Sequence, residues 1–385
     1  MNDTKRFQTG NVILISLGHL FHDIFSSFLA PILPLLITKL SLSYSLAGLL
    51  SVIQRVFALS NPFIGIIADK IRMRYFVIFT PAVTATVMSL LGAAPSYTLL
   101  VVLLIVMSLS STLFHVPAPV MIKRVAGNRT GAGMSFFMLG GELARAVGPI
   151  VILGAVSLWG LDGTYRLIPF GFAASAVLYV RLRNIQISSE FKRKKKEFGA
   201  RETFFRLLPF FTGITGIMMS RGMMKAALTS FLPVYMTAKG ESIWMAGIAL
   251  SILQFAGAGG AFAFGPISDR IGRKQTLLIV SCVTPVFMGL FLYSDGIYTI
   301  PLLIITGLTL IAPTPVFLAM VQDVRTDRPA FINGIFMTIN FVTGAAAVML
   351  VGIFGDTIGL ENTYRLSAGL ALLAVFFAVR LKNNN

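Results

Sequence analysis

The sequence has few charged residues and a single cysteine. Only 12% of its 385 residues are charged and 56% are apolar, whereas a soluble globular domain carries about 25% charged residues. This composition excludes a soluble globular protein. The one cysteine, Cys282, lies in an apolar run and has no second cysteine to pair with, so a disulfide framework and a cysteine metal site are both excluded.

Apolar runs of roughly 20 residues recur along nearly the whole chain, and each is long enough to cross a hydrocarbon layer about 30 Å thick. A bilayer accommodates only helices or closed barrels. The runs are too long and too continuously apolar for the alternating strands of a barrel. We therefore predict an all-α integral membrane protein with twelve transmembrane helices. The predicted spans are 11–38, 45–68, 75–94, 97–122, 131–158, 164–182, 204–236, 243–268, 275–294, 298–322, 329–355 and 362–380.

The basic residues stand mostly at the ends of these spans, on one side of the membrane. The net charge is +17, and the central stretch 181–206 contains Arg193, Lys194, Lys195 and Lys196 in succession. By the positive-inside rule, both termini and this stretch face the cytoplasm, so we predict a multi-pass protein of the cell (inner) membrane. Such a stretch can also bind acidic lipid or nucleic acid. We interpret it as a solvated linker and expect no nucleic-acid partner.

The two halves of the sequence repeat each other. Segment 160–167 (GLDGTYRL) is similar to 359–366 (GLENTYRL) at an offset of 199 residues, and 65–70 (GIIADK) is similar to 265–270 (GPISDR) at an offset of 200. An even number of spans per half makes the repeats parallel, with a central site that suits alternating access. We predict a six-helix bundle over 1–182, a basic cytoplasmic linker over 183–203 and a second six-helix bundle over 204–385, all in a monomer.

The segment 265–274 (GPISDRIGRK) resembles the loop signature of the major facilitator superfamily. The first-half copy keeps Asp69 but has Arg72 and Met73 where the pattern prefers Gly and Arg. The resemblance implies the major facilitator fold and a gating role for the charged residues of both loops, because an Asp near a helix N-terminus can pair with nearby cations. A charged turn that only sets the topology is the alternative. The predicted gating residues are Asp69, Lys70, Asp269, Arg270 and Arg273.

Two further patterns resemble exporters of this superfamily. Segment 140–154 (GGELARAVGPIVILG) is similar to the Gly-Pro signature associated with exporters, although helix packing explains its small residues equally well. Segment 16–23 (SLGHLFHD) together with Phe114-His115 resembles the fosmidomycin-resistance branch of bacterial exporters. That branch typically has Asn before the Asp and Pro after the His, where this chain has His22 and Val116.

Ionisable residues inside spans are rare and mark functional sites. His19, His22 and Asp23 share one face of the first span at i, i+3 and i+4 spacing, so a proton can be shared among them or exchanged with water. Glu142 and Arg145 are i, i+3 neighbours that form either a static ion pair or a pair opened by substrate and proton. We predict that proton coupling involves Asp23, Glu142, His22, His19 and His115.

Cations within the spans favour an anionic substrate, since Arg recognises carboxylate or phosphonate groups in a bidentate manner. The alternative is that they only balance Asp23 and Glu142, or that Lys225 reaches an interface. Three neutral polar residues can add contacts, although hydrogen bonds between helices explain them as well. The predicted substrate-binding residues are Arg55, Arg145, Arg221, Lys225, Gln54, Gln254 and Asn340.

The sequence therefore predicts a proton-coupled secondary transporter, an antiporter or exporter of a small amphipathic or anionic organic compound. It has no phosphate-binding loop of the ATPase type, so the energy must come from an ion gradient, and no cofactor is expected. One alternative is a divalent transition-metal exporter that uses His19, His22, Asp23 and His115. Another is a membrane-embedded lipid-modifying enzyme, which the half repeat disfavours. A third is a receptor or scaffold that retains a transporter fold.

Overall fold

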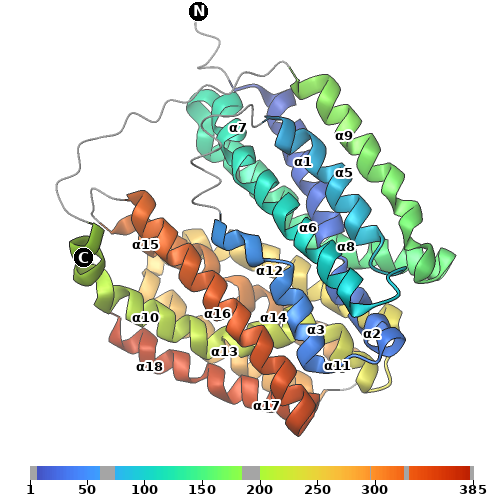
Figure 1. Cartoon of the computed structure of the whole chain (residues 1–385). Helices are drawn as coiled ribbons and strands as arrows, with labels where there is room; N and C mark the ends of the chain where they lie inside the picture. The colour runs from blue at the N-terminus through green and yellow to red at the C-terminus, as the bar shows by residue number, and fades with distance from the viewer. Residues whose placement is uncertain (1–6, 61–73, 184–199, 295, 325–328, 382–385) are drawn as a thin grey trace, which may run out of the picture. The chain divides into compact units, whose positions relative to one another are not determined.

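The computed structural model describes residues 7–60, 74–183, 200–294, 296–324 and 329–381, and these residues are almost entirely helical, with no strand among them (Figure 1). In the first half of the sequence the helices are α1 (Thr9–Ser26), α2 (Leu29–Leu40), α3 (Tyr44–Ile53), η2 (Val56–Ser60), α5 (Arg74–Ser89), α6 (Tyr97–His115), α7 (Pro117–Ala126), η3 (Gly127–Arg129), α8 (Thr130–Trp159), η4 (Asp162–Leu167) and α9 (Ile168–Leu182). In the second half they are α10 (Ala200–Ala226), η5 (Ala227–Phe231), α11 (Leu232–Ala238), α12 (Ile243–Ile271), α13 (Arg273–Leu292), η6 (Gly296–Tyr298), α14 (Thr299–Ile311), α15 (Pro313–Asp323), α16 (Pro329–Ile358), α17 (Leu360–Ala371) and α18 (Leu373–Arg380).

These helices confirm the predicted all-α integral membrane fold. Within the described residues, nine stretches are long and apolar enough to cross a membrane, and Tyr44–Ser60 is a shorter apolar helix. The helices α5 and α9 have 16 and 15 residues and fall on the third and sixth predicted spans. Every predicted span thus overlaps a helix, and the structure is consistent with twelve spans.

Several spans consist of two helices that meet near a proline. Proline has no N–H group and its ring clashes with the preceding turn, so it interrupts a continuous helix. Pro117 stands at the start of α7, and α6 accordingly ends at His115. Pro233 follows the π-helical turn Ala227–Phe231, and Pro313 begins α15. The break before Pro117 leaves His115 on the last turn of α6.

The chain divides into two compact units. Unit 1 comprises the described parts of residues 1–42, 50–191 and 240–251, and unit 2 comprises those of 43–49, 192–239 and 252–385. The predicted boundaries of the two bundles remain a prediction, because residues 184–199 of the predicted linker 183–203 lie outside the described residues.

Each unit contains the same lysine contact, 200 residues apart in the sequence. The Nζ atom of Lys39 donates a hydrogen bond to the carbonyl oxygen of Gly92 at 2.8 Å, and Nζ of Lys239 donates to that of Leu292 at 3.3 Å. In both cases the lysine follows the first predicted span of its half and reaches the end of the third predicted span, which is α5 in the first half and α13 in the second. The repeat found in the sequence therefore includes at least one corresponding contact in each unit.

In unit 1, α1 packs against α5, α7, α8 and α9 (Figure 1). The buried side chains of α1 that face these helices include Val12 and Ile15, which join Phe114 of α6 and Leu178 of α9 in one apolar cluster. This packing fixes the rotation of α1 about its axis. It places the polar face of the helix, which carries His19 and Asp23, against α6.

Candidate functional site

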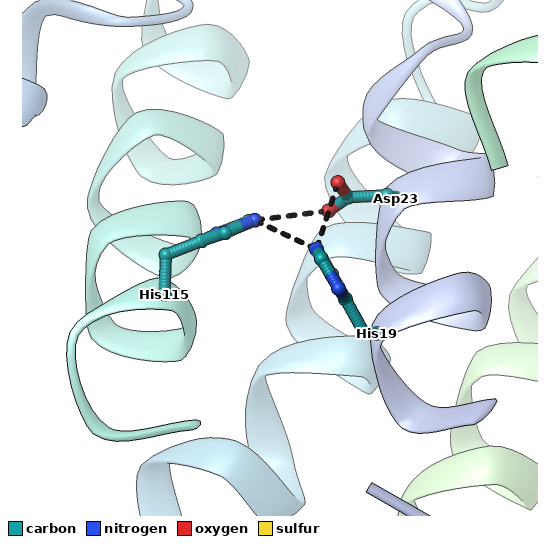
Figure 2. Close-up of side chains that lie close together, drawn as sticks. All are labelled: His19, Asp23 and His115. Atoms are coloured by element: carbon teal, nitrogen blue, oxygen red, sulfur yellow. Dashed lines mark hydrogen bonds and ion pairs between the residues drawn. The ribbon is translucent and has the colours of Figure 1, made fainter. Parts of the chain in front are cut away.

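Three polar side chains converge in unit 1 where α1 faces α6 (Figure 2). His19 and Asp23 lie one turn apart on α1, as their i, i+4 spacing predicts. His115 comes from α6, 96 residues after His19. The Nε2 atom of His19 lies 3.2 Å from Oδ2 of Asp23, Nε2 of His115 lies 3.4 Å from Oδ1 of Asp23, and the two Nε2 atoms are 3.2 Å apart.

Aromatic rings enclose this cluster on one side. The His19 imidazole stacks on the Phe137 ring with centroids 4.0 Å apart and is 5% exposed. The side chain of Asp23 is 13% exposed and that of His115 is 36% exposed. The cluster is therefore most exposed at His115 and most enclosed at His19.

The other ring nitrogens of the two histidines define how the cluster is protonated. Nδ1 of His19 lies 2.7 Å from the carbonyl oxygen of Phe137, and Nδ1 of His115 lies 2.9 Å from that of Ser111. A carbonyl oxygen only accepts hydrogen bonds, so both Nδ1 atoms carry the hydrogen. In the neutral rings both Nε2 atoms then present lone pairs, which point at each other and at the Asp23 carboxylate. Such a group of acceptors attracts a cation.

His22 lies beside the cluster and has a different role. Its Nδ1 lies 2.8 Å from Oδ1 of Asp23, and its Nε2 lies 3.0 Å from Oγ1 of Thr84. Thr84 Oγ1 in turn lies 2.8 Å from Oγ of Ser110. Both ring nitrogens of this fully buried histidine are thus occupied. Of the four residues predicted as possible metal ligands, the structure brings together three, and His22 holds the carboxylate of Asp23 in place.

The Gly-Pro segment of α8 packs directly on this part of α1. A Cβ atom added at Gly141 would lie 2.5 Å from Cε1 and 2.8 Å from Nε2 of His19, and one added at Gly140 would lie 2.5 Å from the carbonyl oxygen of Ser16. One added at Gly148 would overlap the hydroxyl of Ser27. Small residues let helices approach closely, so the glycines of this segment create the space that the His19 imidazole occupies.

Glu142 follows Gly141 on α8 and forms an ion pair with Arg145, as their i, i+3 spacing predicts. The Glu142 side chain is 17% exposed and that of Arg145 is 47% exposed. Both belong to unit 1. Their predicted roles in proton coupling and substrate binding stay predictions, as do the coupling roles of His19, His22, Asp23 and His115.

The remaining predicted substrate residues are divided between the two units. In unit 1, Gln54 donates a hydrogen bond to the carbonyl oxygen of Ser26, and Arg55 is exposed. In unit 2, Lys225 and Asn340 are exposed and Gln254 is half-buried. Their part in binding a substrate remains a prediction.

Arg221 of α10 differs from these residues because it is buried inside unit 2. Its guanidinium group donates to the carbonyl oxygen of Val280 at 2.7 Å, to that of Thr309 at 3.2 Å and to Oγ1 of Thr284 at 3.2 Å. These bonds tie α10 to α13 and α14. The donors that were predicted to bind a substrate are engaged with the neighbouring helices.

The loop signature joins three helix ends in unit 2. Arg273 is the first residue of α13. Its Nη1 atom lies 2.6 Å from Oδ1 of Asp269 at the end of α12, and its Nε atom lies 3.3 Å from Oδ2 of Asp323 at the end of α15. Arg270 is exposed. The corresponding first-half residues, Asp69 and Lys70, lie outside the described residues, so their gating role is still a prediction.

Four residues of these contacts were absent from the sequence-based candidates. Thr84 and Ser110 are small hydroxyl residues in apolar helices, and nothing in the sequence distinguishes them from other such residues. Asp323 and Asp356 are carboxylates at the ends of predicted spans, and that position was a usable signal. Within unit 2, the Asp356 carboxylate accepts hydrogen bonds from the backbone N–H groups of Tyr44 and Ser45, at 2.7 and 2.9 Å, and so caps the start of α3.

Comparison with known sequences gives matches over nearly the whole chain. The fosmidomycin resistance protein of Escherichia coli (strain K12) is 24% identical over 369 residues, covering 94% of this chain and 90% of that protein. The uncharacterized MFS-type transporter YfnC of Bacillus subtilis (strain 168) is 23% identical over 387 residues, and the match covers 94% of this chain and 91% of YfnC.

Two solved structures illustrate the shared fold. The D-xylose-proton symporter has a TM-score of 0.76 at 15% identity, covering 98% of this chain and 99% of the symporter. A bacterial homologue of the human lysosomal transporter Spinster has a TM-score of 0.77 at 15% identity, covering 97% of this chain and 96% of that one. At such identities these similarities establish the fold alone.

The family assignment follows from the sequence. The sequence model of the Major Facilitator Superfamily matches residues 15–348. This match includes the cluster of α1 and α6, the Gly-Pro segment of α8 and the loop signature after α12. The chain therefore belongs to the Major Facilitator Superfamily and is a multi-pass membrane transporter, not an enzyme.

Proposed function

We propose that the chain is a proton-coupled secondary transporter that exports a small amphipathic or anionic organic compound by alternating access. Export is supported by the resemblance of 140–154 to the exporter signature and by the relative in Escherichia coli, whose name is fosmidomycin resistance protein. The transporter lies in the inner membrane as a monomer, with both termini in the cytoplasm and no nucleic-acid partner. The distribution of basic residues along the sequence supports this orientation.

The ion pair of Glu142 and Arg145 carries this proposal. Ionisable side chains within a membrane-spanning helix are unfavourable unless they have a function or a partner. These two neutralise each other on one turn of α8, and both remain partly exposed. The pair is therefore stable in the membrane, yet it is accessible to a proton and to a transported molecule.

A cargo molecule can separate this pair. A donor or cationic group of the cargo binds the Glu142 carboxylate, and an anionic group binds the Arg145 guanidinium, which recognises planar oxyanions through two parallel hydrogen bonds. The proton and the donor group compete for Glu142, so they occupy the transporter in turn. Exchange of cargo for protons follows from this competition. A cargo that bound only Arg145 would instead move together with a proton.

The experiment is a flux measurement on purified protein in sealed liposomes that contain a pH-sensitive dye. Fosmidomycin is the first cargo, followed by a panel of organic anions and amphipathic compounds. For the wild type we expect proton movement opposite to cargo movement. Glu142→Gln removes the exchangeable proton, so coupled proton movement should be lost.

A matched control is available in unit 2. Glu361 and Arg365 form an i, i+4 ion pair on α17, with side chains 51% and 46% exposed. Glu361→Gln removes a carboxylate from this similar pair and should leave the coupling unchanged. Cargo flux with undiminished proton movement in Glu142→Gln contradicts the proposed role of Glu142. Proton and cargo movement in the same direction contradicts exchange.

The loop signature supports a gating role in the same transporter. Arg273 contacts both Asp269 and Asp323, so one guanidinium group holds the ends of α12, α13 and α15 together within unit 2. All three side chains are partly exposed, and their ion pairs can open without burying a lone charge. Such a contact suits a reversible latch at one end of the unit.

A further inference from the structure

The cluster of α1 and α6 contains an unusual concentration of one residue type. The whole chain has three histidines, and all three lie in or beside this cluster. Two imidazoles and one carboxylate offer ligand atoms that lie within 4.8 Å of one another (Figure 2). We propose that His19, Asp23 and His115 form a binding site for a divalent transition-metal ion of the Zn²⁺ type.

The distances between the ligand atoms fit such an ion. Zinc binds imidazole nitrogen and carboxylate oxygen at about 2.0–2.2 Å in a tetrahedron, which places pairs of ligand atoms about 3.3–3.6 Å apart. The Nε2 atoms of His19 and His115 are 3.2 Å apart, and they lie 3.2 Å from Oδ2 and 3.4 Å from Oδ1 of Asp23, respectively. An ion beside these atoms contacts both nitrogens and one carboxylate oxygen after small side-chain movements.

Protons satisfy the same atoms less well. With both Nδ1 hydrogens directed at carbonyl oxygens, one added proton serves one Nε2 atom and leaves the other lone pair facing its neighbours. Two added protons place two positive rings with nitrogens 3.2 Å apart, and like charges at that distance repel strongly. A divalent ion accepts all three lone pairs at once. The geometry therefore favours a metal ion over protons.

The surroundings of the three ligands match those of metal sites in proteins. A ligating histidine almost always donates its second ring N–H group to a carbonyl or carboxylate, which fixes the ring orientation. Phe137 and Ser111 provide such carbonyls for His19 and His115. His22 holds the carboxylate of Asp23 through a hydrogen bond to Oδ1. The site is thus ordered by contacts that lie outside it.

The cluster is open on one side only. The missing side chain of Gly141 lets the His19 imidazole pack closely on α8, since a Cβ atom there would lie 2.8 Å from Nε2. His115 is 36% exposed, so an ion would approach the cluster at that ring. Three protein ligands leave at least one coordination position open for water or for a group of the transported molecule. Imidazole ligands favour Zn²⁺, Co²⁺, Ni²⁺ or Fe²⁺ over Mg²⁺ and Ca²⁺.

The test uses the full chain, purified in detergent with an affinity tag that contains no histidine. Zinc chloride is titrated in a calorimeter, and cobalt chloride is titrated with detection of the visible absorption of tetrahedral Co²⁺. We expect one ion per chain. His19→Ala, His115→Ala and Asp23→Asn should each weaken binding by at least about 100-fold, and His22→Ala, which removes an outer partner, by roughly 10- to 100-fold.

Asp162→Asn is the matched control, because Asp162 is an exposed carboxylate of unit 1 that pairs with Lys39, and binding should be unchanged. X-ray absorption of the zinc-loaded wild type needs no variant and should show two imidazole ligands, so a variant that fails to fold does not decide the outcome. Absence of stoichiometric binding, binding that His19→Ala and His115→Ala leave intact, or a spectrum without imidazole scattering overturns the site. The measurement uses neither cargo nor gradient, so its failure is distinct from failure of the proposed transport.

Discussion

The same position of the repeat carries a histidine in unit 1 and an arginine in unit 2. Pro34 and Pro233 stand 199 residues apart, and the same offset aligns His22 of α1 with Arg221 of α10. Both residues are buried, at 0% and 5% exposure. His22 reaches α5 and Arg221 reaches α13, which are the third predicted spans of their halves. The partner there is Thr84 for His22 and Thr284 for Arg221, 200 residues apart.

The two side chains use this shared position in different ways. His22 makes one contact to Thr84 and turns its other nitrogen to Asp23, so it links the helix core to an ionisable group. Arg221 donates to Val280, Thr284 and Thr309, and the residue aligned with Asp23 at the offset of 199 is Gly222. At this position unit 1 therefore has a histidine that contacts an ionisable cluster, and unit 2 has an arginine that links three helices. The comparison shows that equivalent positions of a duplicated fold can contact an ionisable cluster in one half and stabilise helix packing in the other.

The largest expected effect comes from placing the residue of unit 2 into unit 1. In His22→Arg a permanently charged guanidinium next to Asp23 should form a bidentate pair with its carboxylate and remove it from the cluster. We expect Co²⁺ binding and cargo flux to fall roughly 100-fold, measured by absorption and by the liposome assay. His22→Gln keeps a neutral hydrogen-bonding group and should lose less. Equal activity of the two variants would show that the charge has no influence.

The reverse test removes the charge from unit 2. Arg221→Met deletes the hydrogen bonds to α13 and α14, and we expect a loss of about 2 kcal/mol in the free energy of unfolding, measured by denaturation in detergent. Co²⁺ binding in unit 1 should be unaffected. If Arg221→Met instead keeps its stability and loses cargo flux, Arg221 binds cargo as the sequence predicts, and the contrast between the units fails.

Two glycines of α8 test whether close packing positions His19 in unit 1. In Gly141→Ala the new Cβ atom meets the His19 imidazole, and we expect destabilisation by about 1–3 kcal/mol together with weaker Co²⁺ binding. Gly154 on the same helix has nothing within 4 Å of the Cβ position. Gly154→Ala should therefore raise stability slightly, by about 0.5–1 kcal/mol. The same response of both variants in thermal unfolding would argue against close packing at His19.

The smallest effect concerns the exposed charges of unit 2. Arg273→Ala removes contacts to Asp269 and Asp323, whose side chains are 62% and 52% exposed, so we expect a loss of about 0.5–1 kcal/mol. Arg365→Ala breaks one more exposed pair and should change stability by less than about 0.5 kcal/mol. Denaturation in detergent distinguishes the two. If Arg273→Ala lowers the free energy of unfolding as much as Arg221→Met does, the exposed contacts of Arg273 stabilise unit 2 as strongly as the buried contacts of Arg221.

Much of the site was predictable where its members share a helix. The pairs of His19 with Asp23 and of Glu142 with Arg145 follow from helical spacing, and the structure has both contacts. Thr84 and Ser110 were not predictable, because hydroxyl residues in apolar helices usually bond to their own backbone. The role of Arg221 in substrate binding stays a prediction, whereas the direction of its side chain could not be predicted. That direction is set by the carbonyl groups of α13 and α14, which spacing along one helix does not reveal.

The sequence by itself determined the membrane-spanning helices, the repeat of the two halves and the ionisable residues that share a helical face. These properties depend on hydrophobicity and on the helical period, which are local. Only the tertiary structure decided that His115 meets His19 and Asp23, and that His22 stands aside to hold the carboxylate. The reason is physical: the rotation of each helix depends on close packing at residues such as Gly141, and packing between distant segments is not encoded in the period of either one.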